Sequence, residues 1–206
     1  MSTAHRLSTA QLMEETQTFG FAESILPALA EDERFTPDSV FKPLHEEFGF
    51  TLDVAATAAN ARCPAFLTKA DNALVSSWAR QNVWCNHPWS QTPAWVEKAW
   101  REIVLGCPLI VMLMPDNRTH QRFWQTLVEP FREKVLHVED GSVTLTTRFL
   151  PGRQHFGTPV DPQAKRRARP KHGCVLLIFR HIEPLLELVA GHPAAPQLDL
   201  PFQVRT

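Results

Sequence analysis

The chain has 206 residues, a mass of 23.4 kDa and a formal net charge of −1. This length accommodates one ordinary domain with a tail, but not two independent cores. The hydrophobic share of 44% and the charged share of 21% exclude a disordered chain. No apolar run approaches the roughly 20 residues of a membrane span, and residues 1–10 carry no signal-peptide core. We therefore expect a cytoplasmic protein with no membrane segment.

The cysteines predict neither a metal site nor a disulfide scaffold. Cys63, Cys85, Cys107 and Cys174 stand alone, with no CxxC pair. This isolation is typical of a reducing compartment.

The charge is small in total but uneven along the chain. Residues 1–50 hold nine acidic and three basic side chains, whereas residues 148–172 hold seven basic side chains and one acidic. A neutral total can hide a local anion-binding face. A solvated basic loop is the alternative interpretation.

In chain order, residues 1–33 are predicted to be an N-terminal appendage. Thr36 is placed to cap a helix, with Pro37 in its first turn and Gly49 at its end. Apolar residues at helical spacing support this helix: Val40, Phe41, Leu44 and Phe48.

Strands and helices alternate through the middle of the chain. The predicted strands are Phe50–Val54, Asn82–Cys85, Leu109–Met114, Lys134–Val138, Val143–Phe149 and Val175–Phe179. The predicted helices are Thr92–Leu105 and Asn117–Arg132. This order predicts an α/β domain over residues 34–185, with a mostly parallel sheet, an antiparallel edge and helices on both faces. Residues 148–173 are expected to form a basic loop, and residues 186–206 a tail.

Polar residues follow two of the predicted strands. Asp53 ends the first strand, and Asn86 follows the second. Ligands of open α/β sheets bind beyond the carboxyl ends of the strands, so these residues are candidates for a site.

The segment Asn86-His87-Pro88-Trp89 resembles the (Asp/Asn)-Pro-Pro-(Tyr/Phe/Trp) motif of amino-group DNA methyltransferases. The resemblance extends over residues 34–132, with a weaker echo at 149–153 and 174–179. It is carried by Phe35-Thr36-Pro37, residues 48–56, residues 60–63, Thr68 to Asp71, Leu74, Trp78, residues 83–86 and residues 95–99. Together these segments resemble the phage-type Dam family of DNA N6-adenine methyltransferases.

The resemblance implies a Rossmann-like sheet that binds S-adenosylmethionine. It implies catalytic roles for Asn86, His87, Pro88 and Trp89. It implies cofactor contacts from Thr36, Pro37, Asp53, Ala55 and Asp71. The usual glycine-rich cofactor loop is absent, and residues 55–59 occupy its place with alanines and a threonine.

The chemistry of an exocyclic amino group explains why such a motif is needed. The nitrogen lone pair is delocalised into the ring, so the group is a poor nucleophile. The Asn86 side-chain oxygen and the His87 backbone carbonyl could each accept one amino hydrogen and localise that lone pair. Trp89 would stack on a base flipped out of the duplex.

His87 departs from the resembled motif, which has proline at this position. Proline fixes φ, whereas histidine leaves it free and adds a titratable ring. Activity could persist, the pocket could be retuned for another substrate, or catalysis could be lost. A metal site formed with Cys85 is disfavoured, because no further ligand pair at a suitable spacing is evident.

The basic stretch is a candidate DNA-binding region, because basic side chains contact phosphates. Its members are Arg148, Arg153, Lys165, Arg166, Arg167, Arg169 and Lys171.

The resemblance therefore implies a DNA adenine-N6 methyltransferase that uses S-adenosylmethionine and binds DNA. The resemblance suggests phage or prophage origin and protection from restriction. A non-catalytic nucleic-acid binder on the same fold stays open, as does methylation of cytosine N4 or of RNA. The sequence does not indicate whether the protein is a monomer or an oligomer.

Overall fold

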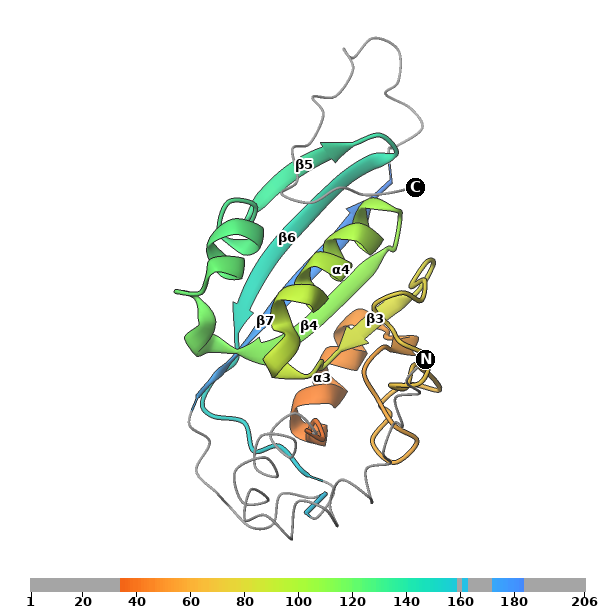
Figure 1. The fold of residues 1–206 in the computed structure, drawn as a ribbon, viewed down its shortest axis with the longest axis vertical. Coiled ribbons are helices and arrows are strands. Elements are labelled where there is room, and N and C mark those ends of the chain that lie inside the picture. Colours follow the sequence, from red (N-terminus) through yellow and green to blue (C-terminus); the bar gives the residue numbers. More distant parts are fainter. Residues whose placement is uncertain (1–33, 159–160, 163–171, 184–206) are drawn as a thin grey trace, which may run out of the picture.

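The computed structural model describes residues 34–158, 161–162 and 172–183. The expected appendage over 1–33 and the tail over 186–206 lie outside the described residues, as does most of the segment between 159 and 171. Figure 1 shows the elements, with the last three strands of the sheet on one side and the short strands on the other.

The first described helix, α3, spans Asp38–Phe48. The predicted cap by Thr36 is wrong, because Pro37 is the N-cap residue and no described side chain caps this end. Gly49 ends the helix as predicted, with φ 61°, because glycine adopts the left-handed conformation without strain. The predicted apolar stripe is buried.

The described residues form a seven-stranded sheet in the order β2-β1-β3-β4-β7-β6-β5. The strands are β1 (Leu52–Asp53), β2 (Ala65–Phe66), β3 (Asn82–Cys85), β4 (Leu109–Pro115), β5 (Lys134–Val138), β6 (Gly141–Phe149) and β7 (Cys174–Ile182). Strand β2 was not predicted from the sequence. The neighbours from β2 to β4 pair in parallel.

The prediction of a mostly parallel sheet is wrong. Strands β7, β6 and β5 pair antiparallel with their neighbours, and these pairings hold most of the paired residues. For β5 and β6 the reason is local, because the tight turn Glu139-Asp140, one residue earlier than predicted, joins them as a hairpin. A parallel pair needs a crossover of a dozen or more residues.

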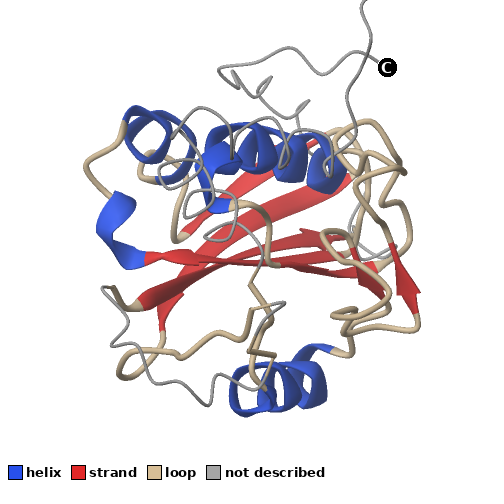
Figure 2. Ribbon diagram, turned by 60° about the horizontal axis from the view of Figure 1, so that its bottom comes forward, coloured by secondary structure: helices blue, strands red, loops and turns tan. Residues whose placement is uncertain are grey.

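Helices cover both faces of the sheet, as Figure 2 shows. Helix α4 spans Thr92–Val104, close to its predicted bounds. The side chains of β4 alternate between two cores because successive residues of a strand face opposite sides. Ile110, Met112 and Met114 pack with α4, whereas Leu109, Val111 and Leu113 pack with α3.

The predicted helix over 117–132 is confirmed only in part. The segment begins in a 3-10 turn, η2 (Asp116–Arg118), and is then helical only over residues 122–128, mostly as a π-helical turn, η3 (Trp124–Val128). The Glu129 N–H donates to the Trp124 carbonyl at 2.8 Å, five residues back. Pro130 follows with no N–H, so it cannot continue an α-helical ladder.

All four cysteines are buried and form no disulfide. Burial raises the pKa of Cys63, Cys107 and Cys174 to about 12, so these thiols stay protonated. Within the described ranges, no three His, Cys, Asp or Glu side chains gather into a metal-ligating group. Within the same ranges, no helix is long and apolar enough to cross a membrane.

Candidate active site

The carboxyl ends of β1 and β3 lie side by side. The two strands pair in parallel, with Asp53 opposite Trp84. Asn86 follows the last residue of β3 directly. The fold therefore places Asp53 and the segment Asn86–Trp89 at the same edge of the sheet.

Asp53 holds the loop that follows β1. Its side chain is 3% exposed. One carboxylate oxygen accepts the Ala55 N–H at 3.2 Å, and the other accepts the Arg62 N–H at 3.0 Å. Burial raises the pKa of Asp53 to about 6, although both backbone hydrogen bonds favour the charged form. Each oxygen keeps acceptor capacity for a further donor.

Asn86 is held by the segment Arg34–Thr36, which we call the strap. The Asn86 Nδ2 donates to the Arg34 carbonyl at 3.2 Å and to the Thr36 Oγ1 at 3.0 Å. The Arg34 carbonyl can only accept, so the Asn86 atom that faces it is the amide nitrogen, which assigns the orientation of the amide. The Oδ1 atom is buried and has no hydrogen-bond partner among the described residues. A buried amide oxygen without a donor is uncommon and indicates a place for one.

The strap also covers the ring of Trp89, which is 8% exposed. The Arg34 guanidinium carbon lies 4.1 Å from the centre of the indole. Phe156 packs edge-on against the same ring, with centroids 5.3 Å apart. Phe35 and Gly157 exchange two backbone hydrogen bonds of 2.9 Å, which tie the strap to the segment of Phe156.

The His87 ring is packed against the core. It is 1% exposed and stacks on Trp95 of α4, with centroids 5.8 Å apart. Its Nε2 atom lies 2.9 Å from the Thr92 Oγ1, and its Nδ1 atom lies 3.9 Å from the Cys85 Sγ. Pro88, the N-cap of the 3-10 turn η1 (Trp89–Gln91), follows it.

The structure divides the predicted cofactor residues into two groups. Three of them lie beside Asn86 or Asp53: Thr36 binds the Asn86 side chain, Pro37 is the next residue after Thr36, and the Ala55 N–H binds the Asp53 carboxylate. Asp71 is exposed and closes a local turn, in which its carboxylate accepts the Thr68 N–H at 2.8 Å. Hydrogen bonds from Thr68 lower the pKa of Asp71, as expected for a turn aspartate.

The predicted DNA contacts also divide. Arg148 lies in β6, not in a loop, and its two terminal nitrogens bind the Glu47 carboxylate of α3 at 2.6 Å each. Arg153 is exposed. The remaining predicted contacts lie outside the described residues: Lys165, Arg166, Arg167, Arg169 and Lys171.

Sequence reasoning missed three residues of this site. Thr92 stands three positions after Trp89 and ahead of a helical proline, so a local signal was present. Arg34 and Phe156 lie far from Trp89 in the chain, and no local pattern indicates their contacts with it.

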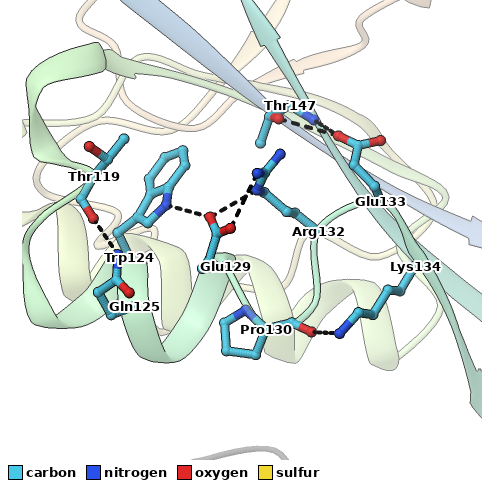
Figure 3. Close-up of polar contacts among 9 residues, drawn as sticks. All are labelled: Thr119, Trp124, Gln125, Glu129, Pro130, Arg132, Glu133, Lys134 and Thr147. Atoms are coloured by element: carbon cyan, nitrogen blue, oxygen red, sulfur yellow. Dashed lines mark hydrogen bonds and ion pairs between the residues drawn. The ribbon is translucent and has the colours of Figure 1, made fainter.

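A separate cavity of about 440 Å³ lies beside the π-helical turn. Its lining residues are Thr119, His120, Trp124, Gln125, Glu129, Arg132 and Phe149. The Glu129 carboxylate accepts the Trp124 indole N–H at 3.0 Å and the Arg132 Nε–H at 2.8 Å, as Figure 3 shows. These polar groups bind one another, and none of the predicted site residues in the described ranges lines this cavity.

Comparison with known proteins identifies the family of this chain. The family model "DNA N-6-adenine-methyltransferase (Dam)" matches residues 23–190. The Escherichia coli (strain K12) protein named "Putative methyltransferase YfdM" is 39% identical over 51 residues. That match covers 24% of this chain and 56% of the relative. The family match spans most of the chain, and the chain therefore belongs to the Dam family of methyltransferases.

Proposed function

We propose that this protein transfers a methyl group from S-adenosylmethionine to the N6 amino group of adenine in DNA. The observation that supports this most directly is the Asn86 Oδ1 atom, which is buried, fixed in direction and without a donor among the described residues. An exocyclic amino group is a donor that such an oxygen would accept.

The donor set at the strand ends fits the cofactor. When bound, S-adenosylmethionine would supply an electrophilic methyl group on a sulfonium sulfur. Asp53 would accept from the ammonium of its methionine part, and Thr36, Pro37 and Ala55 would border the same end of the sheet. We propose that β2, β1, β3 and β4 form the ligand-binding half of a Rossmann-like sheet, because ligands bind beyond the carboxyl ends of parallel strands.

The chain's own groups act by holding the base amino group in place. The Asn86 Oδ1 atom and the His87 carbonyl each accept one amino hydrogen, which localises the nitrogen lone pair. This is catalysis by positioning and preorganised dipoles. The Asn86 side chain would need little reorganisation, because the strap already fixes its amide.

Stacking of the flipped base on Trp89 requires a change in the strap. The Arg34 guanidinium occupies the ring face at contact distance, so the base and this side chain compete for one surface. Base–aromatic stacking contributes about 1–3 kcal/mol and a cation–π contact about 0.5–2 kcal/mol. The exchange is therefore close to balanced, and Arg34 can leave the ring while the strap backbone stays on Asn86.

The test is a methylation assay with tritiated cofactor on unmodified DNA, followed by mass spectrometry of the nucleosides. N6-methyladenine is the expected product. N4-methylcytosine as the product would show that the target base is cytosine. Faster labelling of RNA than of DNA would show that RNA is the substrate. A folded protein that binds DNA but incorporates no label would favour the non-catalytic binder.

Cofactor affinity is expected to depend on the charge of Asp53. The carboxylate must be ionised to accept from an ammonium group, and its pKa is about 6. Affinity is therefore lost as the pH falls through this value, and is about tenfold weaker near pH 5 than near pH 7. Calorimetric titration of the cofactor at several pH values measures this. The Asp53→Asn variant should bind weakly with a flat profile, whereas a wild-type profile that is flat near pH 6 would contradict the role of Asp53.

Phosphate contacts are expected from the basic stretch. Replacing Arg166, Arg167 and Arg169 by glutamine should weaken DNA binding and flatten the dependence of affinity on salt, because up to three counterion-releasing contacts are lost. Fluorescence anisotropy at a series of salt concentrations measures the slope. An unchanged slope would show that these side chains are only a solvated surface.

The resemblance to the phage-type Dam family leads us to propose a phage or prophage origin, in which methylation protects DNA from restriction. Sequencing of modified bases in DNA from cells that express this chain would test that role.

A further inference from the structure

We propose that the His87 side chain is a positioning residue, which braces the segment Asn86–Trp89 through a hydrogen bond to Thr92. This inference rests on the proposed function, because it concerns how the amino-group acceptors are held. It gives the histidine a structural means of replacing the stiffness that a proline would supply at this position.

The hydroxyl of Thr92 sets the direction of the hydrogen bonds. The Thr92 Oγ1 lies 2.9 Å from the Trp89 carbonyl and 2.9 Å from the His87 Nε2. A carbonyl only accepts, so the single hydroxyl hydrogen points to Trp89. The hydroxyl must then accept from the histidine, which assigns a proton to Nε2.

The other ring nitrogen is left as an acceptor and faces a thiol. The Cys85 Sγ lies 3.9 Å from the His87 Nδ1. Burial raises the pKa of the Cys85 thiol well above its usual range, so the sulfur keeps its hydrogen and can donate it weakly. The resulting chain runs from Cys85 through the neutral His87 ring and Thr92 to the Trp89 carbonyl.

This chain joins the two ends of the segment that carries the proposed chemistry. Cys85 is the last residue of β3, and Thr92 is the first residue of α4. All three side chains are almost fully buried, and the ring also stacks on Trp95. Anchoring at Thr92 and stacking hold the ring, and Pro88 restricts the backbone of the residue before it to extended conformations.

The direction of the His87 carbonyl follows from these restraints. Asn86 Oδ1 and His87 O are the two proposed acceptors, and they belong to adjacent residues. A shift of the His87 backbone would misplace one acceptor relative to the other. Misplacement of about 1 Å can cost about a hundredfold in rate, so a brace at this point matters for turnover.

A double-mutant cycle tests the brace. Thr92→Val removes the hydroxyl while keeping the branched shape, and it is made both in the wild type and in the His87→Pro background. In the wild type, the change removes the Thr92 hydroxyl that accepts the buried Nε2–H, and should lower kcat about tenfold or more at unchanged cofactor affinity. In the His87→Pro background, the same change should lower kcat less than about twofold, because the ring is absent and φ is fixed covalently.

Two controls accompany the cycle. Thr92→Ser keeps the hydroxyl and should restore most of the turnover. Thr126→Val removes a hydroxyl that donates to the Arg122 carbonyl at 2.9 Å on the exposed surface, and should leave kcat unchanged. Equal losses from Thr92→Val in both backgrounds would overturn the brace, as would a lower melting temperature with normal kcat per folded molecule.

A spectroscopic measurement covers the case in which Thr92→Val does not fold. The ring nitrogens of wild-type His87 are observed by 1H–15N NMR and assigned by the signals that disappear in His87→Pro. A neutral ring protonated at Nε2 is expected, and a proton on Nδ1 would overturn the inference. A wild type that transfers no methyl group contradicts both the proposed function and this role, whereas an active wild type with equal losses contradicts only the brace.

Discussion

Replacing Asn86 by alanine is expected to abolish methyl transfer, with a loss in kcat of at least about a hundredfold, and to leave cofactor affinity near its wild-type value. The substitution removes the one buried side-chain amide oxygen that has no hydrogen-bond partner among the described residues. Removal of a single preorganised transition-state contact typically costs about 10²–10³ in rate. Steady-state kinetics on unmodified DNA and calorimetry with S-adenosylmethionine measure the two effects separately.

Asn117→Ala is the matched control for this substitution. Asn117 is an exposed asparagine of η2, and its amide lies 3.4 Å from a His172 ring nitrogen. Its removal should change neither quantity. Near-normal turnover of Asn86→Ala would remove Asn86 from the catalytic role. Equal loss of turnover and cofactor affinity would indicate that Asn86 supports the cofactor instead.

Replacing Glu102 by alanine is expected to destabilise the fold by about 3–5 kcal/mol. Glu102 and Lys98 lie on successive turns of α4, where both are buried and their charged atoms are 2.5 Å apart. The second Glu102 oxygen accepts the backbone N–H of Trp78 at 2.7 Å. The alanine variant therefore leaves a buried ammonium group and a buried N–H without their shared partner, and both are costly to leave unpaired.

The same helix supplies a matched control. Glu97 pairs with Arg101 at 3.8 Å, also four residues apart, but the Arg101 and Glu97 side chains are 44% and 43% exposed to solvent. Glu97→Ala should change the free energy of unfolding by less than about 0.5 kcal/mol, because exposed pairs are screened. Urea unfolding of the wild type and the two variants measures the difference. Similar effects at the two positions would show that burial of the Lys98–Glu102 pair is not what makes it important.

Local patterns were enough to locate several parts of the fold and the motif of the site. The apolar residues 109–114 form most of β4, and Gly49 ends α3 because the left-handed conformation favours glycine. The motif at residues 86–89 follows a short buried strand, as its sequence indicates. These features depend on residues within a few positions of one another, so the sequence contains the information for them.

The direction of the later strands could not be predicted in the same way. An apolar run indicates a strand but not its partner or orientation. Strand β7 inserts between β4 and β6 and pairs antiparallel with both. That arrangement depends on contacts between residues tens of positions apart, so the sheet is not mostly parallel, contrary to the expectation from the strand and helix order.

The use of individual polar side chains was likewise decided by tertiary structure. Arg148 is drawn to Glu47, which lies 101 residues earlier in the chain. Arg34 covers the ring of Trp89. The strap orients the Asn86 amide through the Arg34 carbonyl, which lies 52 residues earlier in the chain. The sequence by itself determined which residue types stand at the strand ends, since local apolar patterns place those ends. Only the folded chain decided which atoms are paired and which are left for a ligand, because hydrogen-bond partners are chosen by distance in space.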